Sequence, residues 1–188
     1  MSPFEYLLLL AAVVLGLAIS DLAVSTHRLL NAAGRVRWDA LAPLAACLAF
    51  VRIVTQWWTW YGADGLASRM TFGMFVGVLV SAGLLFLMAA AALPDEIGEE
   101  GINLRVHYRQ VARRYWLLFA AQWTVLNGVS AWAQASIGGA HLNFLSPASM
   151  VLPLSLLLAF VRVTWVQAIG LIGFLLLYIV SYFATTLA

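Results

Sequence analysis

Apolar residues run along this chain in six long stretches, with short polar segments between them. Each stretch is close to the ~20 residues that a helix needs to cross the hydrocarbon core of a bilayer. The strict alternation of apolar and polar residues that marks the strands of a membrane barrel is absent. The sequence therefore predicts an all-α integral membrane protein with six transmembrane helices, at residues 4–25, 41–57, 71–93, 115–134, 147–164 and 167–187.

A short sequence repeat connects the second and fifth of these stretches. Residues 43–54 read PLAACLAFVRIV and residues 153–164 read PLSLLLAFVRVT, with seven of the twelve aligned positions identical. This spacing predicts two units of three helices, 1–94 and 115–188, joined by the linker 95–114. An odd number of crossings in each unit inverts the second unit in the membrane, as in many secondary transporters.

The linker 95–114 has the pattern of an amphipathic helix lying on the cytoplasmic membrane surface. Leu104, Tyr108, Val111 and Tyr115 recur at intervals of three and four residues, which places them on one helix face. Basic residues gather in its second half. They favour either contact with anionic lipid or a plain interfacial connection, and they are Arg105, Arg109, Arg113 and Arg114.

The arginines also predict the orientation of the chain. Eight of them fall in the loops after the first, third and fifth stretches, whereas the even-numbered loops contain only Arg69. Short cytoplasmic loops of membrane proteins carry the excess of basic residues. Both termini are therefore expected on the non-cytoplasmic side.

Composition removes several classes of chemistry. All ten basic residues are arginine, so no lysine can form a Schiff base, and the single cysteine, Cys47, cannot form an intrachain disulfide. The three histidines lie outside the middle of the stretches and have no metal-ligand spacing. We therefore expect no metal, no cofactor, no nucleic-acid partner and no enzyme activity.

Ionisable residues within apolar stretches are the first candidates for a functional site. A charged side chain at mid-membrane costs roughly 2.5–3.5 kcal/mol on insertion scales, so it needs a partner or a path to water. The predicted topology brings Asp21 near Arg162 on the cytoplasmic side and Glu5 near Arg52 on the other side. Each pair could be a gate that opens in turn. Alternatively, both arginines extend to the membrane surface from helix ends.

Polar and aromatic residues supply further candidates. Trp123, Asn127, Ser130 and Gln134 share one face of the fourth stretch, beside Gln122, and Gln56 and Trp57 lie at the outer end of the second. The face lines a pathway or forms hydrogen bonds between helices, and the tryptophans shape a site or belong to an aromatic belt. The candidates for the pathway are Asp21, Arg52, Arg162, Asn127, Trp57, Trp123, Gln56 and Gln122.

Small residues recur at intervals of four along the third stretch, at Gly73, Gly77 and Ser81. This spacing lets two helix backbones approach closely. It predicts helix packing there, either within one chain or between the subunits of a homo-oligomer, as a dimer or a larger assembly.

The stretch from Gly16-Leu17-Ala18-Ile19-Ser20-Asp21 through Arg35-Val36-Arg37-Trp38-Asp39 to Trp57-Trp58 resembles a family of small bacterial inner-membrane proteins with six spans. The resemblance covers about a third of the chain. It implies an inner-membrane location and brings no activity with it.

These observations together predict a transporter or channel for an ion or small solute, with a site at mid-membrane between the two inverted units. Two other functions stay open. One is a membrane subunit that docks a partner protein without transporting anything, and the other is a membrane-lipid enzyme around His27, Arg28 and Asp21.

Overall fold

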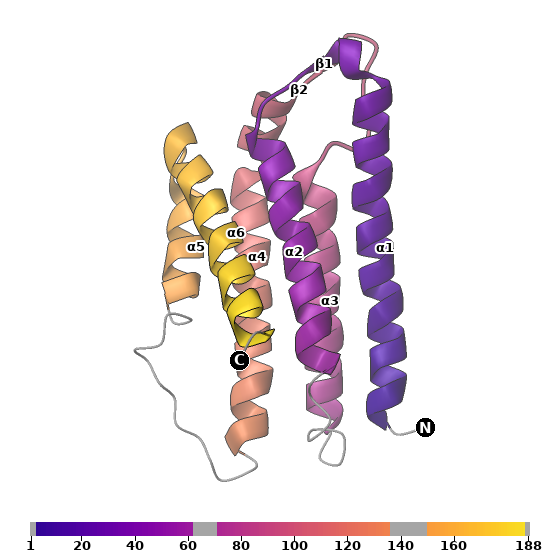
Figure 1. Ribbon diagram of the computed structural model, residues 1–188, viewed down its shortest axis with the longest axis vertical. Coiled ribbons are helices and arrows are strands. Elements are labelled where there is room, and N and C mark those ends of the chain that lie inside the picture. The colour runs from indigo at the N-terminus through magenta and orange to yellow at the C-terminus, as the bar shows by residue number, and fades with distance from the viewer. Residues whose placement is uncertain (1–2, 62–70, 136–149, 187–188) are drawn as a thin grey trace.

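The structure is a computed structural model that describes residues 3–61, 71–135 and 150–186, and this part of the chain is almost entirely helical. Successive helices run in alternating directions along one long axis (Figure 1). The helices are α1 (Pro3–Asn31), α2 (Leu41–Tyr61), α3 (Phe72–Ala92), α4 (Leu104–Ala135), α5 (Val151–Phe160) and α6 (Thr164–Thr186). The predicted all-α class is confirmed.

Four helices, α1, α2, α3 and α6, are long and apolar enough to cross a membrane. The other two differ from the predicted spans. The 32 residues of α4 include many polar side chains. The ten residues of α5 have a length of about 15 Å, half the thickness of a bilayer core. Six crossings therefore remain a prediction.

The separate surface helix predicted for 95–114 is wrong in that form, because residues 104–114 are the first turns of α4. The side chain of Asn103 explains where α4 begins, since its Oδ1 accepts hydrogen bonds from the backbone N–H groups of Arg105 and Val106. The apolar stripe that suggested a surface helix instead faces the protein interior: Leu104, Tyr108 and Tyr115 are all buried.

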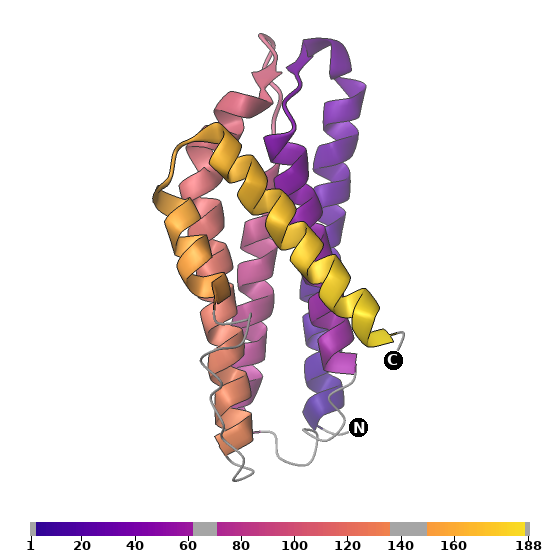
Figure 2. The same ribbon diagram turned by 60° about the vertical axis from the view of Figure 1, so that its left-hand side comes forward.

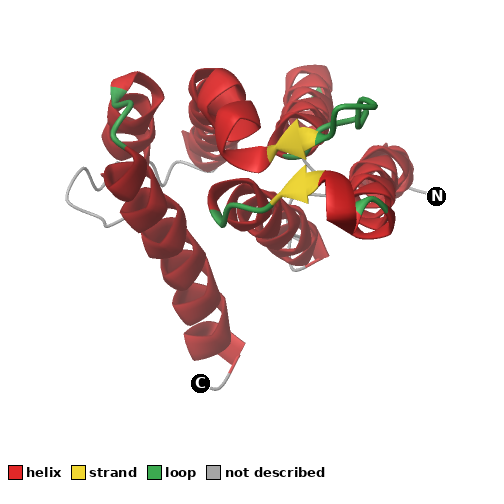
Figure 3. Ribbon diagram, turned by 90° about the horizontal axis from the view of Figure 1, so that it is seen from above, coloured by secondary structure: helices red, strands yellow, loops and turns green. Residues whose placement is uncertain are grey.

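Two short strands close the end of the bundle from which α2 and α4 start (Figure 3). A 3₁₀ turn (Ala33–Arg35) leads into β1 (Val36–Arg37), which pairs in parallel with β2 (Ile102–Asn103). Gly101 makes the approach feasible, because its φ is +83° and a Cβ there would collide with the backbone oxygen of Arg35. The α1–α2 and α3–α4 connections are thereby joined.

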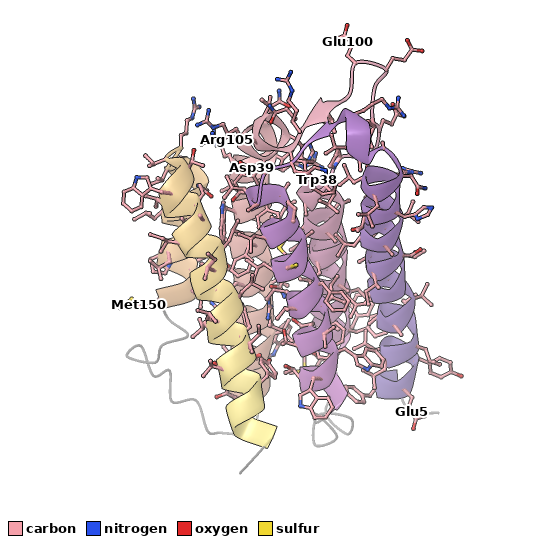
Figure 4. All side chains as sticks on the ribbon, turned by 45° about the horizontal axis from the view of Figure 1, so that its top comes forward. Glu5, Trp38, Asp39, Glu100, Arg105 and Met150 are labelled. Atoms are coloured by element: carbon pink, nitrogen blue, oxygen red, sulfur yellow. The ribbon has the colours of Figure 1, made fainter. Side chains whose placement is uncertain are left out.

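Charged side chains gather at this same end, as Figure 4 shows around Asp39, Glu100 and Arg105. Arg28 donates a hydrogen bond of 2.7 Å to the backbone oxygen of Asp95, and Arg105 lies 3.9 Å from the carboxylate of Asp39. Glu5 lies at the opposite end of the bundle. We call the strand-bearing end the arginine-rich end.

The core lies along the contacts that α3 makes with α1, α2 and α4, while α5 packs on α4. The slanted helix α6 crosses the outside of α2 (Figure 2). Small residues bring α3 and α4 together. A Cβ at Gly73 would lie 2.5 Å from the Trp132 ring, and one at Gly77 would overlap the Val129 side chain. The small-residue face of α3 thus packs within the chain.

This close approach predicts the effect of a large side chain. Gly77→Leu is expected to lower the free energy of unfolding by about 1–3 kcal/mol, because the added atoms force α3 away from Val129. Gly83→Leu is the matched control, since nothing lies within 4 Å of a Cβ at this other position of α3. Thermal unfolding of the two purified variants compares them, and equal melting temperatures would contradict this packing.

Candidate functional site

The candidate site is built around Arg52, whose side chain is only 2% exposed. Arg52 lies near the middle of α2, eleven residues from Leu41 and nine from Tyr61. An arginine side chain keeps its positive charge in proteins. A buried charge needs compensation from its surroundings, so the neighbours of Arg52 decide what the site can do.

Gln122 of α4 is the hydrogen-bond partner of Arg52. The guanidinium Nη2 donates to Gln122 Oε1 over 2.8 Å. Because a guanidinium can only donate, this bond orients the amide of Gln122, whose Nε2 then points toward other acceptors. It donates to Gln56 Oε1 over 3.0 Å and to Ser81 Oγ over 3.1 Å. One charged donor thus sets the direction of hydrogen bonding across α2, α3 and α4.

Two aromatic rings cover the guanidinium. Arg52 Cζ lies 4.6 Å from the ring centroid of Tyr178 in α6 and 5.9 Å from that of Trp123 in α4. Both distances fall within the range of a cation–π interaction, which strengthens when the pair is removed from water. We call the set Arg52, Gln56, Ser81, Gln122, Trp123 and Tyr178 the Arg52 cluster.

The cluster contains hydrogen-bonding groups without a partner in the described residues, and each of these groups can donate. Arg52 Nε, Gln56 Nε2 and the Tyr178 hydroxyl are buried and have no hydrogen-bond partner among the described residues. The two nitrogens are donors, and the hydroxyl can donate. No carboxylate in the described ranges forms a salt bridge with Arg52. A positive charge surrounded by unused donors is complementary to an anion.

The structure brings four of the eight pathway candidates together, namely Arg52, Gln56, Gln122 and Trp123. The other four lie apart. Trp57 is 40% exposed on the outside of α2. Asn127 is exposed and donates to the backbone oxygen of Trp123 over 2.7 Å. Asp21 is half-buried on α1, and no salt bridge joins it to an arginine in the described residues.

The predicted gates are not formed in this conformation. Arg52 is held by Gln122 instead of Glu5, and Arg162 is exposed in the connection between α5 and α6. The two copies of the repeat have different structures: α2 continues for nine residues past Arg52, whereas α5 ends two residues before Arg162. The backbone of Val161 is extended there, with φ −79° and ψ 123°.

Gln167 of α6 explains why helix α5 ends within the second copy of the repeat, and the sequence analysis did not identify this residue. Its Nε2 donates 2.6 Å hydrogen bonds to the backbone oxygens of Leu158 and Val161, at the end of α5. Its Oε1 accepts from Trp116 Nε1 over 2.6 Å and from the Tyr108 hydroxyl over 2.8 Å. The only signal in the sequence is an amide within an otherwise apolar stretch.

Two members of the Arg52 cluster were also missed as site residues. Tyr178 follows four apolar residues in the last stretch and shares no periodic pattern with other polar groups. The spacing of Ser81 matches Gly73 and Gly77 and predicts helix packing alone. Only the fold brings Tyr178 over Arg52, since 126 positions separate them in the chain.

In the described residues, no three histidine, cysteine or acidic side chains come together as metal ligands. No known family model, curated protein or solved structure matches the chain. The geometry of the Arg52 cluster is therefore the basis for assigning a function.

Proposed function

We propose that this protein moves a small anion across a membrane, as a transporter or channel, with the Arg52 cluster as its central site. The observation that carries this proposal is the buried guanidinium, which has unused donors around it and no carboxylate beside it in the described residues. A merely structural arginine would be expected to have its hydrogen bonds filled, because an unmade buried bond costs about 1–3 kcal/mol.

The apolar exterior supports a membrane setting for this site. Four helices are long and apolar enough to cross. Large apolar side chains lie exposed along several helices, among them Leu9, Val54, Ile169 and Val180. Contact of such an apolar surface with lipid is favourable, whereas its contact with water is unfavourable. With the charged end at the membrane surface, Arg52 would lie close to mid-membrane in α2.

Alternation of helix direction supports the inverted arrangement of the two units. Each of α4, α5 and α6 runs opposite to its counterpart α1, α2 or α3 (Figure 1). In our proposal α4 and the predicted span 147–164, which includes α5, complete six crossings, and the arginine-rich end faces the cytoplasm, which leaves both termini on the other side. The bacterial inner membrane is the location that the positive-inside pattern and the family resemblance favour.

The chemistry of anion transfer fits the groups present. A small anion that leaves water loses its hydration and needs charge and hydrogen bonds in return. Arg52 supplies the charge, at about 4 kcal/mol for a contact near 4 Å and an effective dielectric constant of 20. The unused donors of Arg52, Gln56 and Tyr178 replace water molecules. Release of the anion is possible because Arg52 carries the only charge among these donors, while Gln56 and Tyr178 are neutral.

The cluster is closed to solvent in this conformation, since its atoms without a hydrogen-bond partner are buried. The proposed cycle therefore includes movement. Rocking of one unit against the other would separate α2 from α4 or α6 and expose Arg52 to one side at a time. The bond from Arg52 to Gln122 and the ring of Tyr178 are the contacts that such a movement would loosen.

Flux through sealed proteoliposomes tests the proposal. Halides and small carboxylates are expected to cross faster than in protein-free vesicles, with and without an imposed voltage, whereas potassium and protons are not. Cation flux would contradict the assigned substrate class. Silence toward every solute, with folded protein, would favour the non-transporting docking subunit instead.

A further inference from the structure

A second basic site lies at the arginine-rich end, away from the Arg52 cluster. It is a cavity of about 640 Å³ between α4 and the α5–α6 connection. Three arginines line it: Arg109 and Arg113 from α4, and Arg162 from the connection. None of the described residues that line this cavity is acidic. We call it the three-arginine pocket.

The pocket is held in shape by contacts of its own. Arg109 Nη2 donates to Thr164 Oγ1 over 3.0 Å, and Arg113 Cζ lies 5.3 Å from the ring centroid of Phe160. Gln167, which also lines the pocket, is fixed by the hydrogen bonds that cap α5. The Tyr108 hydroxyl, which also lines the pocket, donates to Gln167 Oε1 over 2.8 Å.

The start of α6 adds to the positive potential. Thr164, the first residue of this 23-residue helix, lines the pocket. The first backbone N–H groups of a helix have no partner within it, and the helix dipole favours an anion there. Three guanidinium groups and a helix start around one cavity match the charge and the several acceptor oxygens of a phosphate group.

The surroundings of the pocket favour a lipid as the carrier of that phosphate. Phe160, Val163 and Trp165 expose 64%, 46% and 67% of their surface beside the arginines. An apolar surface next to a cationic pocket suits a molecule with acyl chains below a charged headgroup. In the proposed orientation this is the level at which headgroups of the cytoplasmic leaflet lie.

From these observations we infer that the three-arginine pocket binds the phosphate group of an anionic membrane lipid. This inference rests on the membrane setting of the proposed function, although it does not require transport. It also limits lipid binding to two of the four arginines in 104–114 for which the sequence suggested it. Arg109 and Arg113 line the pocket together with Arg162, whereas Arg105 lies near Asp39 and Arg114 is not among the lining residues.

Lipid binding to the purified full chain in neutral detergent tests the inference, with native mass spectrometry across a titration of each lipid. Phosphatidylglycerol is expected to bind at least 10-fold more tightly than phosphatidylcholine. The double variant Arg113→Gln/Arg162→Gln is expected to lose this preference. The matched control, Arg37→Gln/Arg114→Gln, removes two exposed charges outside the pocket and should keep it.

Two results would overturn the inference. Equal losses in both double variants would mean that phosphatidylglycerol responds to overall charge and not to the pocket. Binding of inorganic phosphate without binding of phosphatidylglycerol would assign the pocket to a soluble ligand. Because the readout is lipid binding, absence of flux would leave the inference standing and would count only against the transport proposal.

Discussion

Replacement of Arg52 by methionine is expected to abolish anion flux while leaving the melting temperature unchanged or higher. Methionine keeps most of the buried volume but removes the charge that compensates the anion for its lost hydration. A loss of about 4 kcal/mol of interaction corresponds to more than a 100-fold fall in flux. Removal of a buried charge recovers its desolvation penalty, which offsets the loss of the hydrogen bond to Gln122 and of the contact with Tyr178, so an apolar side chain of similar size is tolerated or favourable.

The two readouts together distinguish a functional arginine from a structural one. Flux is measured in sealed vesicles and thermal unfolding in detergent, for Arg52→Met beside Arg114→Gln. The control removes one exposed charge outside both the Arg52 cluster and the three-arginine pocket, and should behave as the unmodified protein. A methionine variant that melts much lower and still transports would show that Arg52 serves the fold alone.

Replacement of Gln167 by leucine is expected to produce the largest loss of stability, about 3–5 kcal/mol. The amide makes four hydrogen bonds of 2.6–2.8 Å to Leu158, Val161, Trp116 and Tyr108. Leucine would leave two backbone oxygens at the end of α5 and the Tyr108 hydroxyl without these partners, at about 1–3 kcal/mol for each buried group. Trp116 retains its second acceptor, the oxygen of Tyr108.

Chemical or thermal unfolding of the purified variants measures this effect. Gln134→Leu is the matched control, because Gln134 is an exposed amide on α4. The control should change the free energy of unfolding by less than about 0.5 kcal/mol. Similar stabilities for the two variants would contradict the role of Gln167 as the residue that joins α4, α5 and α6.

The sequence predicted helix boundaries accurately where a change from polar to apolar residues sets the boundary. Helix α2 begins at Leu41 as predicted, and α3 at Phe72, one residue from the predicted start. It failed where polar residues extend or end a helix. Helix α1 continues to Asn31, six residues past the predicted end, with Leu29 still buried. Helix α5 ends early because a side chain from α6 caps it, which no local pattern reveals.

The site was predicted in part for the same reason. Arg52, Gln56 and Gln122 stand out as polar residues within apolar stretches, and that signal needs no tertiary information. Their partners depend on how helices cross. The pairing of Arg52 with Gln122 instead of Glu5 follows from the packing of α2 on α4, and Tyr178 arrives with the slanted α6.

The identical segments of the repeat show the limit most directly. Leu48 to Arg52 and Leu158 to Arg162 read the same, LAFVR, yet the first arginine is buried in a helix and the second is exposed in a connection. Gln167, from α6, donates to the backbone of the second segment, whereas the backbone oxygen of Arg52 in the first accepts a hydrogen bond from Thr55 of its own helix. A repeated sequence therefore gave two different arginine sites, a central cluster and a surface pocket.

Anions are expected to reach the Arg52 cluster from water, and a cysteine introduced in place of Ser81 tests this access most directly. Ser81 is fully buried and accepts a hydrogen bond from Gln122, so Ser81→Cys places a thiol within the cluster. Cys47 is exposed on α2 and must first be replaced by alanine. In sealed vesicles, a negatively charged thiosulfonate reagent is expected to modify the introduced thiol faster than a positively charged reagent of similar size. Arg52→Met should abolish that preference. A thiol that neither reagent reaches, in protein that is otherwise folded, would contradict a water-connected anion site.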